Sequence, residues 1–294
     1  MYLQYKKIKN ALLVLAAGLT IGSCQKLSHP ELPSNYPKDA NPPGGPLKFF
    51  AAMDGTNVDS IRANFGTDKK ITYVAGISGQ AMQEGDVSGN IVYPSTNDFD
   101  QVTSFTVAFW LSKAGPNPAG AGSAFAFGLS TNKSIWTYQD MFLEFEDAGN
   151  PSSSDSAAFK FYVNDQWFEF IKVKKTNGQD SIDKRLPKLL DGQWHHLAFS
   201  FDQASSTLTT YLDGKAYTNL PAGFGKFTNN NGKVDFSQIA GLVIGGVGSF
   251  GVGKSPSDIG QTWMGNFNGK IDQFRLYGTA LAAADVAALY ANKQ

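Results

Sequence analysis

Apolar side chains at every second position are the feature that most constrains this chain. Phe105, Val107, Phe109 and Leu111 follow this spacing, and the segment 197–201 repeats it with Leu, Phe and Phe. Alternate residues of an extended strand point to the same face, so each segment presents one apolar face. The pattern predicts half-buried strands here, and further strands are expected near 47–53, 124–129, 141–146, 158–163, 168–173, 240–244 and 269–277.

Turn signals and composition agree with an all-β fold. Asp213 and Gly214 separate two short strand-like runs, and such a pair favours a tight hairpin because glycine tolerates positive φ. The chain has 31 glycines, 22 Phe, 11 Tyr and 5 Trp, a mixture typical of many short strands. Helical spacing is convincing only over 282–292, where Asp285 lies near the positive end of the helix dipole. We therefore expect an antiparallel two-sheet sandwich with a short C-terminal helix.

The first 23 residues are expected to be a lipoprotein signal peptide. Three lysines at positions 6, 7 and 9 precede the apolar run 11–21, which is too short to cross a membrane. The run ends in Ile-Gly-Ser followed by Cys24, which resembles a bacterial lipobox. Cys24 is the single cysteine of the chain. Lipidation of Cys24 is predicted, with a lone buried thiol as the alternative.

Residues 24–46 are expected to form a tether. The segment contains prolines at positions 30, 33, 37, 42, 43 and 46 and glycines at 44 and 45. Proline at this density favours extended chain over a packed element. The prediction is a gram-negative outer-membrane lipoprotein anchored in the cell envelope. An acidic surface-export run after the cysteine is missing, so the leaflet stays open.

Two stretches resemble the closing half of a laminin-G-like, concanavalin A-type lectin domain. One begins Asp191-Gly-Gln-Trp-His-His-Leu-Ala-Phe-Ser-Phe-Asp202, and the other is Gly269-Lys-Ile-Asp-Gln-Phe-Arg-Leu-Tyr277. The likeness covers 47–294 and implies one antiparallel jelly-roll domain. Domains of this family serve as lectins, as adhesion modules and as domains fused to enzymes, so the fold alone names no ligand.

Aromatic side chains are the first candidates for ligand contact, because a sugar ring presents an apolar face that can stack on them. Trp110 and Trp194 lie in the family's core motifs, and Trp263 is expected to be core as well. The candidates that remain for a glycan contact are Trp136, Tyr138 and Trp167, each beside a polar segment. Ordinary sheet packing is the alternative for all three.

Acidic residues of the segment 143–147 raise the question of glycoside hydrolysis, since β-glucanases share this fold. Glu144 and Glu146 lie on one strand face, with Asp147 after them. The glucanase signature Glu-x-Asp-x-x-Glu would place aspartate at position 146 and glutamate at position 149, where the chain has Glu146 and Gly149. We therefore expect solvent-facing acids and no enzymatic activity.

Other chemistries find less support. His195 and His196 are adjacent on a strand and point to opposite faces, which favours structural roles over a shared metal. The run Gly246-Val-Gly-Ser-Phe-Gly251 matches a dinucleotide fingerprint in letters only, because proline and glycine interrupt any helix after it. Equal numbers of basic and acidic residues, 25 each, with no basic stripe argue against nucleic acid.

A structural calcium ion is the one cofactor that the resemblance suggests. Asp54 and Asp272 resemble positions where related jelly-roll domains carry aspartates, and Asp59 is a further oxygen donor. Calcium takes six to eight oxygens, many of them from backbone. The alternative is that these aspartates cap turns. The function expected from all of this is glycan binding without catalysis, with an envelope protein partner as the alternative and a degenerate hydrolase as a third possibility.

Overall fold

The computed structural model describes residues 45–84, 88–118, 120, 122–146, 152–153, 156–173 and 182–293. The predicted signal peptide, Cys24 and nearly all of the tether lie outside the described residues, as does Asp147.

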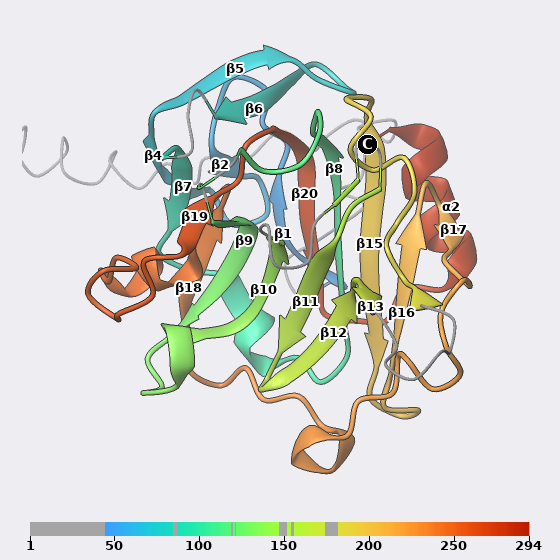
Figure 1. Ribbon diagram of the computed structural model, residues 1–294. Coiled ribbons are helices and arrows are strands. Elements are labelled where there is room, and N and C mark those ends of the chain that lie inside the picture. Colours follow the sequence, from blue (N-terminus) through green and yellow to red (C-terminus); the bar gives the residue numbers. More distant parts are fainter. Residues whose placement is uncertain are drawn as a thin grey trace, which may run out of the picture. The chain divides into compact units, whose positions relative to one another are not determined.

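Two sheets, antiparallel except for one strand pair, form a sandwich, which confirms the predicted fold class (Figure 1). Sheet A runs in the order β17 (Lys215–Ala216), β16 (Thr207–Leu212), β15 (His195–Asp202), β8 (Phe105–Ser112), β20 (Lys270–Tyr277), β1 (Leu47–Ala51), β2 (Val58–Asp59) and β3 (Asn64–Phe65). The hairpin of β5 (Ile71–Ala75) and β6 (Gln80–Glu84) joins it through β20.

Sheet B runs in the order β12 (Gln166–Phe170), β11 (Phe159–Val163), β10 (Gln139–Phe145), β9 (Ser123–Thr131), β18 (Ile239–Ile244), β7 (Asn90–Tyr93) and β4 (Thr67–Lys69). The short β19 (Met264–Asn266) pairs parallel to β9. A separate pair consists of β13 (Lys172–Val173) and β14 (Ile182–Asp183).

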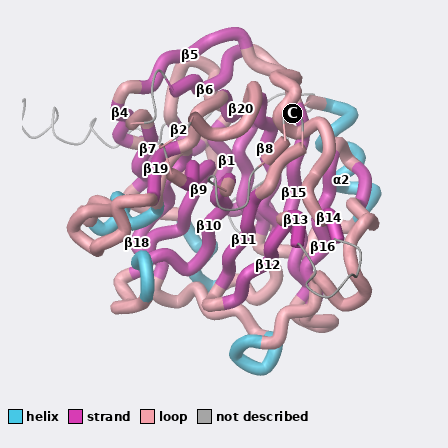
Figure 2. The backbone as a smooth tube through the Cα atoms, viewed as in Figure 1, coloured by secondary structure: helices cyan, strands magenta, loops and turns pink. Residues whose placement is uncertain are grey.

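Helical segments are short (Figure 2). The α-helix α2 spans Ala283–Asn292, and the 3-10 turns are η1 (Asn97–Gln101), η2 (Trp136–Tyr138), η3 (Asn229–Gly232) and η4 (Gly248–Val252). The described part of the chain has no helix with both the length and the apolar character needed to cross a membrane.

The core between the sheets follows from the period-two pattern. Phe105, Val107, Phe109 and Leu111 of β8 are all buried, and they join one cluster with Phe199 and Phe201 of β15. The inward residues of β9, β10 and β11 complete this cluster from sheet B: Phe127, Leu129, Leu143, Phe159 and Phe161. The predicted interior side of both strands is confirmed.

The opposite face of β8 is buried too, which the strand pattern did not predict. Helix α2 covers it, and Val286 of the helix packs with Ala108 and Ala198 in a second cluster. Trp110 stacks on Tyr290 of α2, with ring centroids 5.4 Å apart. A strand that reads as amphipathic is therefore buried on both sides, because the C-terminal helix supplies its outer cover.

The predicted hairpin at Asp213 and Gly214 is confirmed. Both residues have positive φ, 50° and 74°, as a two-residue turn of this class requires. Glycine is needed at 214 for a second reason: a Cβ there would lie 2.8 Å from Cβ of Tyr290. The turn is therefore also the place where sheet A meets α2.

Candidate functional site

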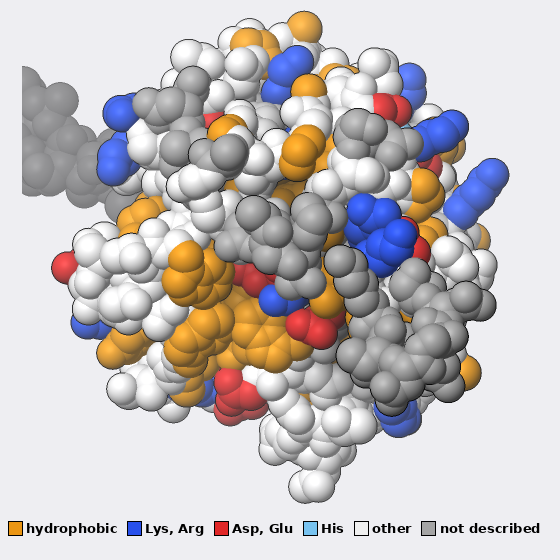
Figure 3. All heavy atoms as spheres, in the orientation of Figure 1, with side chains coloured by type: hydrophobic (Ala, Val, Ile, Leu, Met, Phe, Trp, Pro, Cys, Tyr) orange, Lys and Arg blue, Asp and Glu red, His pale blue; other side chains and the backbone are white. Residues whose placement is uncertain are grey.

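An aromatic cluster covers part of the outer face of sheet B, over β10, β11 and β12. We call Trp136, Phe142, Tyr162, Trp167 and Trp263 the aromatic platform. Phe142, Tyr162 and Trp167 lie opposite one another on β10, β11 and β12, so the strand register builds a ladder of rings. Figure 3 shows the resulting hydrophobic patch with acidic and basic side chains beside it.

Trp136 is the exposed member of the platform. Its side chain lies against Trp167, with centroids 5.4 Å apart, and stacks on Trp263 at 6.2 Å with the planes 20° apart. Even so, 41% of Trp136 remains exposed. A large ring that is held in place yet still open to solvent suits a stacking contact with a ligand.

The turn η2 between β9 and β10 gives Trp136 this position. Thr137 and Tyr138 follow it with φ of 62° and 53°, a conformation that costs non-glycine residues about 1 kcal/mol or more each. Strain of this kind persists where the surrounding structure holds it, often at functional sites. The turn also separates Tyr138 from Trp136, although both were predicted ligand contacts. The Tyr138 ring lies outside the platform, 4.9 Å from the ammonium of Lys254.

A polar pocket of about 350 Å³ adjoins the platform. It is lined by Lys133, Ile135, Asp140, Asn164, Asp165, Asn229, Asn230 and Asp235. The pocket meets the platform at two places: Ile135 precedes Trp136, and the Tyr162 hydroxyl donates a 2.6 Å hydrogen bond to Asp165.

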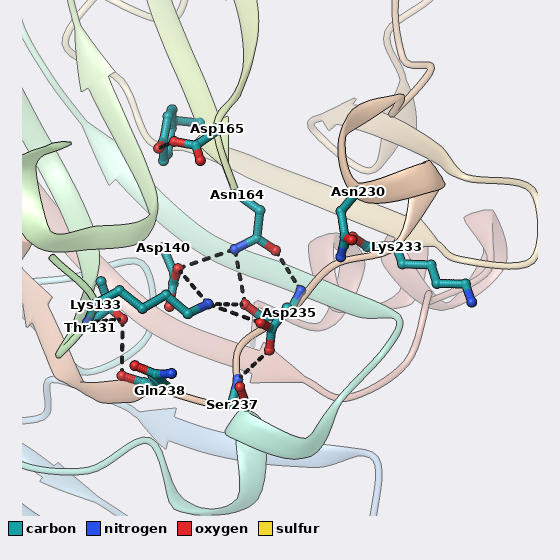
Figure 4. A network of polar contacts seen from close by, with 11 residues as sticks. Thr131, Lys133, Asp140, Asn164, Asp165, Asn230, Lys233, Asp235, Ser237 and Gln238 are labelled. Atoms are coloured by element: carbon teal, nitrogen blue, oxygen red, sulfur yellow. Dashed lines mark hydrogen bonds and ion pairs between the residues drawn. The ribbon is translucent and has the colours of Figure 1, made fainter. Parts of the chain in front are cut away.

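Lys133 organises the floor of the pocket (Figure 4). Its ammonium lies 3.2 Å from Oδ2 of Asp235 and 3.5 Å from Oδ1 of Asp140. Asn164 adds a reciprocal pair: its side chain donates to the Asp235 carbonyl at 3.1 Å and accepts from the Asp235 amide at 2.7 Å. Burial raises the pKa of Asp140, and the Lys133 charge opposes that rise. The pocket therefore offers fixed carboxylate and amide groups at the edge of an aromatic surface.

Comparison with known proteins decides the family. A family model described as the concanavalin A-like lectin/glucanases superfamily matches residues 85–287, more than half of the chain. The chain belongs to this superfamily. None of the curated proteins matches it.

Solved structures share the concanavalin A-like fold at low identity. The Trypanosoma rangeli sialidase in complex with 2,3-difluorosialic acid aligns with a TM-score of 0.54 and 14% identity, over 87% of this chain and 35% of that one. The binding domain of botulinum neurotoxin DC in complex with rat synaptotagmin II aligns at 0.50 and 12%, over 84% and 51%. The binding domain of Paraclostridial Mosquitocidal Protein 1 aligns at 0.52 and 14%, over 84% and 52%. The chain thus spans about a third to a half of these proteins.

Because the superfamily includes glucanases, the acids on β10 need a direct description. Glu144 and Glu146 lie on the outer face of sheet B, but they are only 2% and 5% exposed, so the prediction of solvent-facing acids was wrong. The Lys160 ammonium lies 2.7 Å from Glu146, 4.0 Å from Glu144 and 3.7 Å from Glu169. Burial alone would lower the pKa of Lys160, and these carboxylates raise it overall.

The two histidines make separate structural contacts. His195 bridges two carboxylates, with Nδ1 2.9 Å from Asp213 and Nε2 3.1 Å from Asp191. His196 packs against the Trp110 ring instead. Strand β15 thus places one histidine on each of its faces, as its alternation predicts.

The segment 246–251 also proves structural. It leads into the short η4 turn, where the Gly248 amide donates a 2.7 Å hydrogen bond to the side-chain oxygen of Gln139. A Cβ at Gly248 would lie only 2.6 Å from that side-chain oxygen, so close packing requires glycine there.

The aspartates proposed for calcium hold turns. Oδ2 of the fully buried Asp272 accepts the Ile77 amide at 2.8 Å, and Asp54 accepts the Gln80 amide at 2.7 Å, so both fix the turn between β5 and β6. Burial, with a smaller contribution from the Asp54 charge, raises the pKa of Asp272 to about 6.

Asp59 lies elsewhere and accepts the Phe50 amide at 2.9 Å. A calcium ion needs six to eight oxygens. Within the described residues no group of three or more His, Cys, Asp or Glu side chains could hold a metal. The observed hydrogen bonds fit the turn-capping alternative, and calcium binding stays a prediction.

Sequence reasoning found part of this site. It named Trp136 and Trp167, which the structure brings together, and Tyr138, which it separates from them. It placed Trp263 in the core, whereas Trp263 is half-buried in the platform, and Trp194 is half-buried as well. It did not predict roles for Lys133, Asn164 and Asp235. Two of them lie in the polar segments 131–134 and 164–166, whose position beside Trp136, Tyr138 and Trp167 made those aromatics candidates.

Proposed function

We propose that this member of the concanavalin A-like superfamily binds carbohydrate, without catalysis, at the aromatic platform and its adjoining pocket. The observation that carries the proposal is the position of Trp136, an open indole braced by two other tryptophans beside a pocket of carboxylates and amides. A sugar ring can stack on Trp136 while its hydroxyls bond to Asn164, Asp165 or Asp235, which line the pocket and are not buried.

The known structures support two kinds of ligand. The sialidase is in complex with a sialic acid derivative, and the neurotoxin domain is in complex with a protein. For this chain we favour the glycan, because the platform exposes only one ring, Trp136, while its other rings are buried or half-buried, and because the exposed large hydrophobics of the described residues are scattered over the molecule. They lie on β3, η2, β13, β14 and α2: Phe65, Trp136, Val173, Ile182 and Tyr290. A protein partner would be better served by one contiguous apolar patch.

The non-catalytic part of the proposal is supported by the state of the acids on β10. Glycoside hydrolysis needs two carboxyl groups open to the scissile bond. Glu144 and Glu146 are instead buried and engaged with Lys160. A reducing-sugar assay tests this. If the wild type released reducing sugar and Glu144→Gln did not, the chain would be a hydrolase.

We further propose that Cys24 carries the lipid anchor and that the domain acts in the cell envelope, tethered to the outer membrane. The proposal is supported by the sequence 1–46 alone: the basic start, the apolar run, the Ile-Gly-Ser-Cys junction and the proline-rich segment.

A glycan array probed with the detergent-solubilised full-length chain tests the binding proposal. Titration calorimetry on the best ligand should then show that Trp136→Ala weakens binding by about 1 to 2 kcal/mol, or about 5- to 30-fold. Phe65→Ala is the matched control, because Phe65 is 67% exposed on the edge strand β3 of the other sheet. Absence of any bound glycan, together with recovery of a specific protein partner, would move the function to adhesion.

A further inference from the structure

The charges around the proposed glycan site are strongly unbalanced. Six carboxylates surround the platform and pocket, against two ammonium groups, Lys133 and Lys160. The carboxylates are Asp140, Asp165, Asp235, Glu144, Glu146 and Glu169. Lys160 ties the glutamates to the platform, since its ammonium lies 5.4 Å from the centre of the Trp167 ring. Among these described residues, carboxyl groups therefore outnumber ammonium groups by four.

Both of these cations already have carboxylate partners. Lys133 is held between Asp140 and Asp235, and Lys160 contacts three glutamates. Of the lysines nearby, Lys254 lies over the Tyr138 ring, outside the platform, and Lys184 lies over Phe224. Figure 4 shows the Lys233 side chain directed away from Lys133 and Asp235.

The carboxylates at the rim are the ones that a ligand would meet first. Asp165 and Asp235 are both exposed, and Asp165 sits at the turn between β11 and β12, next to the platform. Glu169 is also partly open, with 43% of its side chain exposed. Asp165 and Asp235 would repel a negative ligand group at the rim, whereas an ammonium group would bond to them directly. At Glu169 the charge of Lys184 offsets part of this repulsion.

From this arrangement we infer that the site selects glycans by charge: amine-bearing glycans bind best, uncharged glycans less tightly, and carboxylate-bearing glycans least. The inference rests on the proposed glycan-binding function and adds the chemical class of the ligand. It works by repulsion as well as attraction, which is how sites discriminate between ligands of the same shape.

Matched oligosaccharides test the inference. The probes are β-1,4-linked hexasaccharides of glucose, glucosamine and glucuronic acid, together with the corresponding galacto-configured set. Calorimetric titration of the full-length chain is done at pH 6 in low salt and again at 0.3 M NaCl. We expect the acidic member to bind at least about fivefold more weakly than the uncharged one, and the amine to bind more tightly. The differences should shrink in high salt, because screening shortens the reach of the charges.

Two substitutions locate the effect. Asp165→Asn and Glu169→Gln each remove one rim charge and keep the side-chain shape. Each should lower the ratio of the Kd for the acidic ligand to the Kd for the uncharged ligand by about two- to fivefold in low salt. Asp68→Asn is the control, since Asp68 is exposed on β4 at the opposite edge of sheet B and should leave the ratio unchanged.

The outcomes separate the two proposals. Acidic ligands that bind as tightly as uncharged ones, or ratios that do not respond to the two substitutions, would overturn the charge inference and leave glycan binding intact. If no oligosaccharide of either set binds, and the glycan array is empty as well, the proposed function fails and the inference falls with it.

Discussion

Phe161 and Phe199 stack across the middle of the sandwich, with ring centroids 4.2 Å apart and parallel planes. Phe161 belongs to β11 of sheet B and Phe199 to β15 of sheet A, so the pair joins the two layers. Both rings are fully buried. Phe199 also meets Phe159 and Phe170 edge-on, which places it at the centre of an aromatic core.

Replacing Phe199 with alanine should therefore destabilise the domain by about 3 to 5 kcal/mol, because a cavity would open where four rings meet. Chemical denaturation followed by fluorescence measures the loss. Phe65→Ala, on an exposed edge, should change the free energy of unfolding by no more than about 0.5 kcal/mol. A loss below about 1 kcal/mol for Phe199→Ala would mean that the core does not depend on this stack.

The contact of helix α2 with sheet A gives a second prediction. Val286 is fully buried against Ala108 and Ala198, while Ala288 of the same helix is exposed. Val286→Asp should cost about 3 kcal/mol or detach the helix, since an unpaired charge is expensive to bury. Ala288→Asp places the same charge in solvent and should have little effect.

Detachment of α2 has its own signature. Tyr290 covers Trp110, so loss of the helix would open that indole to water. Acrylamide should then quench more of the tryptophan fluorescence in Val286→Asp than in Ala288→Asp. Equal stability and equal quenching in the two variants would show that the helix contributes little to the fold.

The sequence predicted the core and two rings of the site, Trp136 and Trp167, but not the pocket beside them, and the difference has a physical reason. The segments 105–111 and 197–201 indicate their own burial, because apolar side chains that face the core of a sandwich recur at every second residue of a strand. The pair Asp213-Gly214 predicts its turn, because the turn needs positive φ and glycine adopts positive φ readily. These signals are local, so one sequence is enough to interpret them.

The pocket has no local signal. Lys133 and Asp235 are 102 residues apart, and Asn164 and Asp235 are 71 apart, so only the pairing of β9 to β12 and the passage of 229–235 beside them create it. The burial of Glu144 and Glu146 was misjudged similarly. The alternation within one strand shows which residues share a face. It does not show which side chains of other strands cover that face, here Lys160 of β11.

The anchoring prediction concerns residues before the domain. Cys24→Ser should abolish incorporation of labelled palmitate and either release the protein from the membrane fraction or leave it as uncleaved precursor. Ser23→Ala is the matched control, because it keeps a small residue before the cysteine and should be processed normally. Normal processing and normal membrane partitioning of Cys24→Ser would remove the lipoprotein assignment.

The last prediction concerns Asp272 and the dependence of stability on pH. The pKa of this buried carboxyl is about 6 in the folded chain, above its usual value of 3.8, so between these values the folded state binds more protons than the unfolded state. Stability should therefore fall as pH rises from about 4 through 6, because the folded chain must then hold an ionised carboxylate away from water.

Asp272→Asn keeps an acceptor for the Ile77 amide and removes the charge. In EDTA it should be more stable than the wild type at pH 7.5, by about 1 to 3 kcal/mol because the pKa of Asp272 is raised to about 6, and its stability should vary less between pH 4.5 and 7.5.

Bound calcium predicts the opposite order of stability, because a cation beside Asp272 stabilises the ionised form. With 5 mM calcium chloride the wild type would then become the more stable protein at pH 7.5. Denaturation curves across this pH range, with and without calcium, distinguish the two cases. Identical profiles for the wild type and Asp272→Asn in EDTA would show that this carboxyl does not control the stability of the turn between β5 and β6.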